Sequence, residues 1–586
     1  MSPVCGKIEV LDEFRSWAGV ARRARRRLRR RRTEDWRTLR WKEIQRNVRR
    51  LQQRIYRAER RGDWKRVHSL QRLLLRSRSS RCLAVRQVTQ ENRGKRTAGV
   101  DGIASLKPRQ RLKLARRLKN LSDWKVAPIR RKRIPKPGSR EWRKLGIPVM
   151  ADRAMQALAK QALEPEWEAK FEPNSYGFRP GRSAHDAIEA IFNAICLKSK
   201  YVLDADIEKC FDEISHEALL FKLNAIQPIM RLVRAWLKTG IVDGGEMIFP
   251  EAGTPQGGVI SPLLANVALH GLEEAIEQAA PRKHRAIVIR YADDLVILCA
   301  DLETLIELKE VAEEWLTTVG LHLKPGKTRI THTLNEHEGN VGFDFLGFNV
   351  RQYRVGKHRT RTYRGEPGFK TIIQPSKKAL KRHHEKIGEV IRQHRGAPQK
   401  ALIAALNPII RGWTQYYRTC VAKRTYSTMD YQMSRKPAHW SQRRHPTKTM
   451  GWRFHRYWRW RKTRMSFSDG QNTLICYVDT PIRRHVKVKG DKSPYDGDWV
   501  YWVQRLGRDP TKSNRLIGLL KRQTGQYDRG CDGGSSLGWK PEQQPVYQPG
   551  LTPRPLSRSD TRRTVPMTRP HTLRSPVIGK PSRGVL

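Results

Sequence analysis

The most constraining stretch of this sequence is residues 286–298, where two apolar, largely β-branched runs flank a short polar centre. That centre contains Arg290, Tyr291, Asp293 and Asp294. The pattern predicts a tight β-hairpin with two adjacent carboxylates at its tip. An Asp pair in a turn is most often ordinary turn chemistry, but these like charges repel each other and strands that we expect to be buried enclose them. The stretch therefore favours a functional site at the tip of the hairpin.

A second run places another carboxylate beside a strand. Residues 201–207 have a β-type composition and contain Asp206 near their end. If Asp206 and Asp293 meet across adjacent strands, their oxygens form a site for hard divalent cations such as Mg²⁺. Two such ions, typically ~3.5–4 Å apart, activate a 3′-hydroxyl and stabilise a leaving pyrophosphate. The carboxylates thus indicate a nucleotidyltransferase.

The charge of the chain indicates its partner. The 586 residues include 118 Lys and Arg against 56 Asp and Glu, a formal net charge of +62. Such a chain repels itself unless a polyanion neutralises it, so we expect a nucleic acid as the partner. We expect no membrane partner, because no apolar run reaches the length of a membrane span. The chain start lacks an apolar signal region and none of the eight cysteines forms a Cys-x2-Cys pair, which indicates a reducing compartment and excludes a disulfide framework.

The beginning of the chain is predicted to be basic and helical. Nine arginines within residues 22–32 predict either a solvated arm or an arm that binds phosphates. Apolar residues from Trp41 to Ala58 recur at spacings of three and four, which predicts an amphipathic helix. Asp63 is expected to cap the helix that follows. We expect the apolar stripe to pack and the basic faces to offer RNA a surface.

Farther along the chain the pattern changes several times. Residues 97–370 alternate helical and strand patterns, residues 376–420 are helical again, and residues 500–504 (Val-Tyr-Trp-Val-Gln) have a strand-like pattern. Residues 541–586 contain nine prolines and no periodicity, which predicts a disordered tail. The length and these changes predict two to four domains.

Seven blocks in one order along the chain resemble the reverse transcriptases of the group II intron maturase family. The hairpin tip Tyr-Ala-Asp-Asp at 291–294, and Asp206 followed five residues later by Phe211, resemble two motifs of the catalytic region of that family. The other matching blocks are residues 97–102, 134–136 with 143–148, 174–182, 253–266 and 345–348. So many blocks in the family order make a chance resemblance negligible.

The resemblance implies an α+β, right-hand polymerase fold with fingers and an antiparallel palm sheet, followed by an α-helical thumb and a basic C-terminal region. The thumb also serves as domain X, the maturase domain of the family. The implied parts are a basic Arg-rich leader at 1–34, an N-terminal helical extension at 35–96, fingers and palm at 97–375, thumb and domain X at 376–465, a DNA-binding region at 466–526 and a disordered Pro- and Arg-rich tail at 527–586.

The resemblance also implies roles for single residues at the reaction centre. Asp206, Asp293 and Asp294 would be the catalytic residues and would hold two Mg²⁺ ions, with the backbone of Ile207 as a further ligand. The dNTP substrate would be met by five residues: Lys136, Arg143, Phe211, Gln256 and Lys327.

These five residues would act in different ways. Lys136 and Arg143 would clamp the triphosphate, Lys as a point charge and Arg as a fork. Gln256 would line the nucleotide pocket, and Lys327 would lie near the primer. Phe211 would stack under the sugar and exclude a 2′-hydroxyl, the alternative being a simple core aromatic. The position after Arg143 is Lys in this chain, where the family usually has Pro.

The segment 406–417 resembles domain X, which viral-type reverse transcriptases lack, and Trp440 with the basic run 443–448 continues the pattern. We expect most aromatic residues here to pack helices and the cations to face outward. Rings that stack on unpaired bases and cations that meet phosphates are typical of RNA binding. The expected RNA-binding residues are Arg25, Arg26, Arg27, Arg29, Arg30, Arg411, Arg443 and Arg444.

After domain X this family often has a DNA-binding region and an HNH nuclease with paired Cys and His around a metal. Residues 519–526 resemble the approach to that nuclease, but beyond them the sequence contains only Cys531 and His571 of those residue types. We therefore expect an HNH-lacking or HNH-truncated member that does not cut the second strand of its target.

Together these features predict an RNA-directed DNA polymerase that binds group II intron RNA, assists its splicing and supports retrohoming into target DNA by target-primed reverse transcription. Priming would then use the host DNA replication machinery. Two alternatives stay open: a non-mobile RNA-binding splicing maturase, and a reverse transcriptase of a defence or adaptation system. The intact carboxylates argue against a polymerase that has lost its activity. We expect a bacterial cytoplasmic protein that associates with the nucleoid when it binds DNA.

Overall fold

The computed structural model describes residues 35–135, 141–356, 368–461 and 464–523. All of them belong to one compact unit that ends at Gln526. Lys136, the five arginines of the leader and the tail at 527–586 lie outside the described residues. Among the helices of the described ranges, none is both long enough and apolar enough to span a bilayer.

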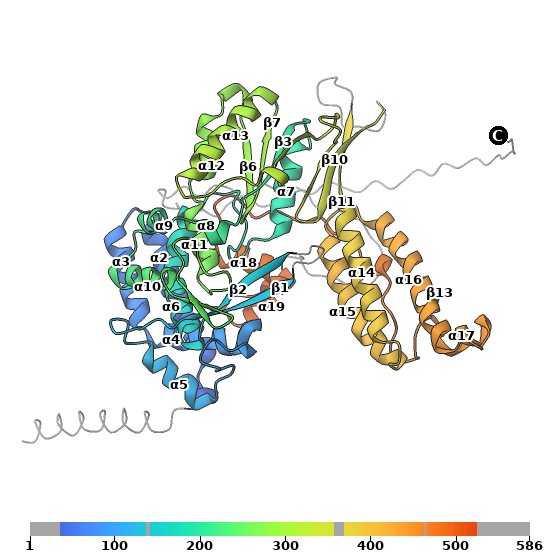
Figure 1. The fold of residues 1–586 in the computed structure, drawn as a ribbon, viewed down its shortest axis with the longest axis horizontal. Helices are drawn as coiled ribbons and strands as arrows, with labels where there is room; N and C mark the ends of the chain where they lie inside the picture. Colours follow the sequence, from blue (N-terminus) through green and yellow to red (C-terminus); the bar gives the residue numbers. More distant parts are fainter. Residues whose placement is uncertain (1–34, 136–140, 357–367, 462–463, 524–586) are drawn as a thin grey trace, which may run out of the picture. The chain divides into compact units, whose positions relative to one another are not determined.

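The N-terminal helices form where the apolar stripe predicted them. Helix α2 (Trp41–Glu59) buries one face, including Val48 and Ile55, and helix α3 (Trp64–Arg76) begins at Asp63, whose carboxylate accepts from Arg66 N at 3.0 Å. Both helices and α4 (Arg78–Arg86) pack on α6 (Met150–Lys170), which is buried on most sides (Figure 1). Helix α5 (Pro108–Arg117) packs on α4.

A central sheet of four antiparallel strands, in the order β6-β7-β3-β8, carries the predicted hairpin. Its strands are β3 (Tyr201–Asp206), β6 (Ile287–Tyr291), β7 (Asp294–Cys299) and β8 (Arg329–His332). One face packs on helices α12 (Leu272–Ala279) and α13 (Leu302–Thr317), and α7 (Ala184–Ile195) packs against β6.

Both faces of this sheet are buried. Leu295 and Ile297 of β7 belong to the apolar cluster that contains α13, whereas Val296 and Leu298 belong to a second cluster that contains α7. Burial on both faces explains why β7 is a continuous apolar run and not an alternating one.

A second four-stranded sheet, in the order β2-β1-β4-β5, combines two strands that precede α6 in the chain with two that follow it. Its strands are β1 (Ile129–Pro135), β2 (Trp142–Ile147), β4 (Ile241–Asp243) and β5 (Glu246–Ile248). The helices between the two sheets in sequence are α8 (Cys210–Glu213), α9 (His216–Leu223), α10 (Gln227–Leu237) and α11 (Ser261–Ala268).

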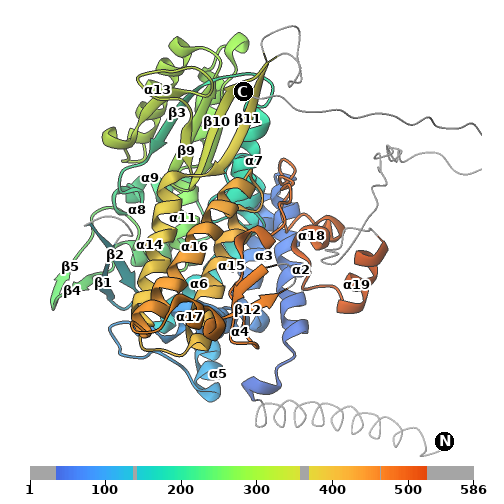
Figure 2. The same ribbon diagram turned by 90° about the vertical axis from the view of Figure 1, so that its right-hand side faces the viewer.

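Three long helices follow a third sheet of β9 (Phe343–Phe345), β10 (Phe348–Arg354) and β11 (Phe369–Pro375). They are α14 (Lys377–Gln393), α15 (Gln399–Tyr417) and α16 (Lys423–Arg444), shown in Figure 2. Aromatic residues pack them as expected: His383 stacks on Trp413 with ring centroids 4.8 Å apart. The hydroxyls of Tyr416 and Tyr417 donate to the carbonyls of Leu346 and Gly347 at 3.0 and 3.1 Å, which ties α15 to the turn between β9 and β10.

The C-terminal part begins with α17 (Met450–Tyr457) and the hairpin of β12 (Trp458–Arg461) and β13 (Arg464–Phe467). It ends with α18 (Trp499–Leu506) and α19 (Asn514–Gln523). The prediction of a strand at 500–504 is wrong, because these residues lie inside α18. Asp498 caps the start of that helix by accepting from Tyr501 N at 3.1 Å, and Gly507 ends the helix with a left-handed backbone at φ 70°. A five-residue apolar pattern suits a strand or a helix, so these two caps decide for the helix.

Residues 481–507 form a strap that packs on much earlier parts of the chain. The buried carboxylate of Asp186 in α7 accepts from Val488 N at 2.8 Å and from His485 Nε2 at 3.1 Å, and it also pairs with Arg505. Near it, Arg182 donates to the carbonyl of Gly490 at 2.9 Å. The strap therefore joins the predicted DNA-binding region to the helix that covers the central sheet.

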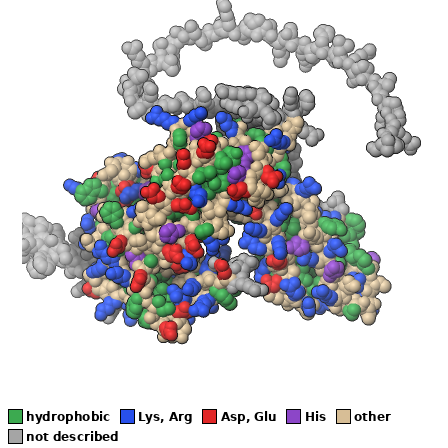
Figure 3. Space-filling model, turned by 45° about the horizontal axis from the view of Figure 1, so that its top comes forward, with side chains coloured by type: hydrophobic (Ala, Val, Ile, Leu, Met, Phe, Trp, Pro, Cys, Tyr) green, Lys and Arg blue, Asp and Glu red, His purple; other side chains and the backbone are tan. Residues whose placement is uncertain are grey.

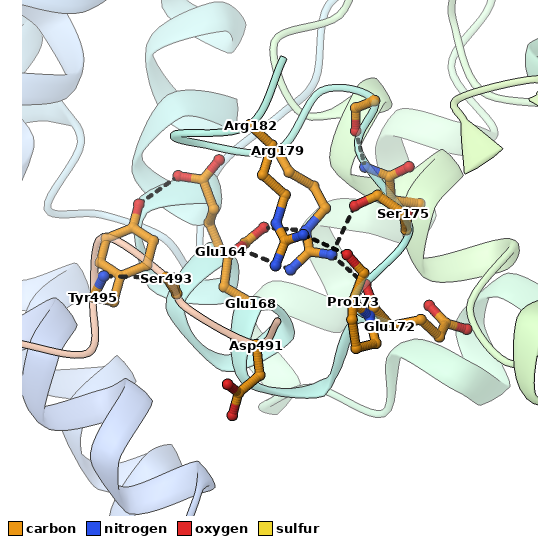
Figure 4. A network of polar contacts seen from close by, with 12 residues as sticks. Glu164, Glu168, Glu172, Pro173, Ser175, Arg179, Arg182, Asp491, Ser493 and Tyr495 are labelled. Atoms are coloured by element: carbon orange, nitrogen blue, oxygen red, sulfur yellow. Dashed lines mark hydrogen bonds and ion pairs between the residues drawn. The ribbon is translucent and has the colours of Figure 1, made fainter. Parts of the chain in front are cut away.

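The same strap also reaches the N-terminal helices. The hydroxyl of Tyr495 donates to Glu164 of α6 at 2.7 Å, as Figure 4 shows, and Asp491 pairs with Arg60 at 2.7 Å. Gly181 lets the strap approach closely, because a Cβ there would lie 2.5 Å from the ring of Trp502. Contacts between residues about 300 positions apart thus close the described unit.

We expect the substitution Asp186→Asn to destabilise the protein by roughly 3–5 kcal/mol, because it leaves the mostly buried Arg505 without its charge partner. Urea unfolding followed by circular dichroism measures the change. The control is Glu313→Gln, which removes a carboxylate from the exposed pair with Lys309 on α13 and should cost at most about 1 kcal/mol. Equal effects of the two substitutions would contradict a central role of Asp186 in holding the strap.

Candidate active site

The hairpin between β6 and β7 turns within two residues, Ala292 and Asp293. Tyr291 pairs with Asp294 across the turn, and Ala292 adopts a left-handed backbone at φ 61°, which is unfavourable for a residue with a Cβ. Gly177 packs directly on this turn, since a Cβ on Gly177 would lie 2.3 Å from Ala292 N. Close packing from outside therefore holds the turn in its strained conformation.

The register of the central sheet brings the three predicted carboxylates to one edge. Asp206, the last residue of β3, lies opposite Asp294, the first residue of β7. The backbone N–H of Ile207 donates to the carbonyl of Asp293 at 3.0 Å and fixes the turn against the end of β3. The residue opposite Asp206 is therefore Asp294, whereas Asp293, which was expected to meet Asp206 across adjacent strands, lies in the turn just before β7.

The carboxylates raise one another's pKa values. Burial, followed by the charges of Asp293 and Asp206, raises the pKa of Asp294 to about 7. Burial and the charge of Asp206 also raise the pKa of Asp293. Lys327, in the short η5 helix (Pro325–Lys327), forms an ion pair with Asp206. Negative charge thus accumulates at this edge, and a cationic side chain already neutralises part of it.

These residues suit a divalent cation. No group of three His, Cys, Asp or Glu side chains in the described ranges is arranged to hold a metal ion as it stands. Mg²⁺, however, is usually held by one or two carboxylates together with substrate phosphates and water. Carboxylate oxygens are its preferred protein ligands, and their mutual repulsion at Asp293 and Asp294 would be relieved by a cation. The reverse transcriptase domain uses a divalent metal and dNTP substrates in general.

Buried Arg290 holds the hairpin to two other sequence blocks. Its guanidinium is fully buried, donates to Asn266 Oδ1 at 3.4 Å and lies 3.8 Å from Glu172. The amide of Asn266 in turn donates to the carbonyl of Gly177 at 2.8 Å. The backbone carbonyl of Arg290 accepts from Tyr176 N at 2.9 Å. Residues from the blocks 174–182, 253–266 and 291–294 thus meet directly behind the carboxylates.

A cavity of about 410 Å³ lies beside the carboxylate site, between β2 and the 253–256 loop. Phe211 and Gln256 line it, and the carbonyl of Phe211 accepts from Thr254 N at 2.6 Å. The loop needs glycine: Gly253 has φ 84° and a Cβ there would lie 2.4 Å from the carbonyl oxygen of Asp212. Phe211 is partly buried and packs edge-on against Phe178 with centroids 6.0 Å apart. The structure therefore places Phe211 and Gln256 in one cavity, as the nucleotide-pocket hypothesis requires.

The remaining predicted nucleotide-binding residues are distributed around this cavity. Arg143 on β2 is exposed, and its charge offsets a small part of the rise in the pKa of Asp293, so it lies near enough to act on that carboxylate. Lys144, its neighbour, lines the cavity with Arg131 of β1. Successive residues of a strand point to opposite faces, so the two cations serve different sides of β2. From the sequence, Lys144 was noted only as a departure from the family pattern, and Arg131 was not identified. The alternation of side chains along a strand next to Arg143 could have indicated that Lys144 faces the other side.

Three family models match the chain. The model described as reverse transcriptase (RNA-dependent DNA polymerase) matches residues 134–350, the N-terminal domain of reverse transcriptase matches 36–118, and the group II intron maturase-specific domain matches 380–458. The chain is also 30% identical over 318 residues to protein YkfC of Escherichia coli strain K12, an alignment that covers 47% of this chain and 81% of that protein. The chain belongs to the family of group II intron-encoded reverse transcriptases and maturases.

Other relatives carry the family in their names. The chain is 35% identical over 195 residues to the group II intron-encoded protein LtrA of Lactococcus lactis subsp. cremoris, an alignment that covers 32% of each protein. It is 26% identical over 383 residues to maturase-like protein 1 of Euglena gracilis, with 64% of this chain and 76% of that protein covered. This reverse transcriptase is an RNA-directed DNA polymerase with a maturase domain, and its match to LtrA extends over about a third of LtrA.

The predicted RNA-binding residues within the described ranges lie on the maturase domain. Arg411 is exposed on α15, and Arg443 and Arg444 are exposed at the end of α16. Arg444 donates to the carbonyl of Ala397 at 2.8 Å and lies over the ring of Trp440 at 5.3 Å. The cations face outward while the aromatic residues pack the helices, as expected from the sequence.

We expect Asp294→Asn to stabilise the metal-free reverse transcriptase at pH 8 and to stabilise it clearly less at pH 5. Because the folded state raises the pKa of Asp294, the folded protein binds the proton more tightly than the unfolded chain, and wild-type stability falls as the pH rises from about 4 to about 7. Asn mimics the protonated form and avoids a loss on the order of 2–4 kcal/mol. Urea unfolding in EDTA at both pH values measures the difference in the free energy of unfolding between the variant and the wild type. A gain in stability that does not depend on pH would contradict the assigned electrostatic cause.

Proposed function

We propose that this reverse transcriptase polymerises DNA on RNA at Asp206, Asp293 and Asp294, helps group II intron RNA to splice, and supports retrohoming by target-primed reverse transcription. The observation that carries the proposal is the register that sets Asp206 opposite Asp294, with the turn of Asp293 bonded to Ile207. In the right-hand description the central sheet is the palm, the β1–β2 hairpin belongs to the fingers and α14–α16 form the thumb.

The chemistry divides between metal and protein. Two Mg²⁺ ions, held by the three carboxylates and the backbone of Ile207, would supply Lewis-acid assistance to the 3′-hydroxyl and the leaving pyrophosphate. The protein positions the reactants: Phe211 and Gln256 line the cavity for sugar and base, Arg143 with Lys136 meets the triphosphate, and Lys327 stands beside Asp206 toward the primer.

The maturase function rests on the basic outer surface of the chain. The match to the group II intron maturase-specific domain at 380–458 supports intron RNA as the partner. Arg411, Arg443 and Arg444 are placed to meet its phosphates, and the leader arginines Arg25, Arg26, Arg27, Arg29 and Arg30 add to the cationic charge of the sequence. Such contacts give affinity that depends on salt and carry no sequence information by themselves.

Mobility is the part of the proposal that involves DNA. Target DNA would be met by outward faces of residues 466–526, because the strap at 481–507 uses its inward face to pack on α6 and α7. We propose that priming uses a 3′ end made by the host replication machinery, in the bacterial cytoplasm at the nucleoid.

We expect the double substitution Asp293→Ala, Asp294→Ala to lower Mg²⁺-dependent primer extension on an RNA template by several orders of magnitude, because two of three anionic ligands are lost. RNA binding should persist, since it rests on the widely spread cations. Glu313→Ala, Glu314→Ala, which removes two carboxylates from α13, is the control and should extend primers normally. Extension by the Asp double mutant would show that the polymerase site lies elsewhere.

We expect Phe211→Val to raise ribonucleotide incorporation relative to deoxyribonucleotide incorporation, because the shorter side chain opens space beside the 2′ carbon in the cavity. Competitive single-nucleotide extension with both triphosphates measures the ratio. Phe221→Val changes an aromatic residue that is 86% exposed on α9 and serves as the control. An unchanged ratio in a folded Phe211 variant would assign this residue to the core.

A further inference from the structure

A groove lined by cations runs between α14 and α16 of the maturase domain. It comprises a cavity of about 860 Å³ and an adjoining cavity of about 510 Å³, which share Gly388, Arg392 and Lys436 and so form one channel, the α14–α16 groove. The cationic residues along it are Lys381, Arg392, Arg395, Arg424, Lys436, Arg443 and Arg444. Glu385 is the only acidic residue among the described residues that line it.

Two of these cations converge on the floor of the groove. Both cations lie over Gly388, because a Cβ there would be 3.6 Å from Arg392 Nη1 and 3.8 Å from Lys436 Nζ. Within the described part of the chain neither of them forms an ion pair with a carboxylate. Burial and the charge of Arg392 lower the pKa of Lys436. Like charges that converge in this way are relieved by an anion from outside.

The groove adjoins an exposed aromatic tip. Trp440 lines the groove and packs edge-on against Tyr457 of α17 and Phe467 of β13, with ring centroids at 5.3 and 5.8 Å. Figure 2 shows α17 and β12 at the same end of α14 and α16. The base of the β12–β13 hairpin is therefore part of the core, and its outer end extends from the mouth of the groove.

The outer end of this hairpin exposes the indole of Trp460. At the base, Trp458 and Phe467 pair across the strands and are 6% and 4% exposed. One pair farther out, Trp460 is 74% exposed opposite Met465. A ring this exposed leaves its face open to stack on a planar group of a ligand.

The sequence around Trp460 is rich in cations. Arg459 and Arg461 flank it, and residues 431–468 contain 11 Lys and Arg and no Asp or Glu. Figure 3 shows Lys and Arg prevailing over acidic side chains on the right-hand side, where α14, α16 and α17 lie in Figure 1. A nucleic-acid strand supplies both groups that this surface can bind, phosphates for the cations and flat ring faces for the indole.

We propose that this end of the maturase domain binds an unpaired nucleic-acid strand, with backbone phosphates in the α14–α16 groove and a base stacked on Trp460. Unpaired bases have open ring faces, whereas the faces of paired bases are covered by their neighbours in the duplex. The inference rests on the proposed maturase function and deepens it, because it names an unpaired strand as the feature of the RNA that this domain binds. An unpaired segment of intron RNA and a displaced strand of target DNA share this chemistry.

Equilibrium binding of the full chain to a fluorescent 12-nucleotide oligouridine tests the stacking contact. Trp460→Ala should weaken binding roughly 5- to 150-fold, the range for one stacked base. Trp460→Phe, which keeps a ring, should recover most of the affinity. Phe221→Ala removes an exposed aromatic residue from α9 and should bind as the wild type does. Because Trp460 is exposed, thermal melting should be unchanged.

The salt dependence tests the groove. Arg392→Gln, Lys436→Gln should lower the slope of log Kd against log salt by roughly 1.4, about 0.7 for each lost phosphate contact on a single strand. Lys309→Gln, Lys386→Gln removes the same charge from two exposed lysines that pair with neighbouring glutamates, and should leave the slope nearly unchanged.

Cross-linking separates this site from the other basic surfaces of the chain. An oligonucleotide with 5-iodouridine, irradiated on the wild-type chain, should label the peptide that contains Trp460. An oligodeoxynucleotide of equal length shows whether DNA is gripped as well as RNA, and a blunt 12-base-pair RNA duplex should show no loss in the Trp460→Ala variant. The proposal would be overturned if Trp460→Ala lost as much affinity for the duplex as for the single strand. It would also be overturned if Trp460→Ala bound the single strand as tightly as Phe221→Ala does and no cross-link formed at Trp460. Extension of a pre-annealed primer by the unsubstituted chain, measured in parallel, tests the proposed polymerase function independently.

Discussion

The buried guanidinium of Arg290 is the interaction on which the arrangement of the active site depends. It lies one residue before the turn that carries the carboxylates, and it is bonded to Asn266 and close to Glu172. Burying a charge is costly unless partners compensate it, so this position selects one packing of the surrounding segments. Removing either partner would leave a charge or a polar group without compensation beside the hairpin.

The carboxyl groups around Arg290 divide into charged and neutral forms. The hydrogen bond from His270 and the charge of Arg290 outweigh burial and lower the pKa of Glu172 to about 2. Burial and the charge of Glu172 raise the pKa of fully buried Glu273 to about 8. One acid thus neutralises the arginine and the other stays protonated near pH 7. The cluster holds the hairpin without adding negative charge to the edge where Asp206, Asp293 and Asp294 already repel each other.

The rest of the molecule joins this centre to surfaces for nucleic acid. The strap carries the C-terminal segment back to α6 and α7 through Tyr495 and Asp186, so a region that follows the maturase domain in sequence supports the polymerase in space. The α14–α16 groove and the β12 strand with Trp460 belong to the maturase domain, whose helix α15 is attached to the β9–β10 turn through Tyr416 and Tyr417. Polymerisation and RNA recognition can therefore use separate surfaces of one body.

The sequence by itself determined the elements whose pattern is local. The two apolar runs around Asp293 and Asp294 made a hairpin, the stripe from Trp41 to Ala58 made α2, and the family blocks pointed to the carboxylates and to the pocket of Phe211 and Gln256. Local pattern was insufficient at 500–504, where a short apolar run suits a strand or a helix and the caps at Asp498 and Gly507 decided for the helix.

Only the tertiary structure decided how distant segments meet. No periodicity in the sequence relates Asp186 to Val488 or Glu164 to Tyr495, because such contacts depend on how whole elements pack. The same holds for the convergence of Arg392 and Lys436 over Gly388, which arises where two helices 40 residues apart in the chain lie side by side. Strand register likewise set Arg143 toward the carboxylates and Lys144 into the cavity, since successive side chains of a strand face opposite ways. Sequence patterns specify which face of an element is apolar, whereas the partner of that face is chosen by packing of the complete chain.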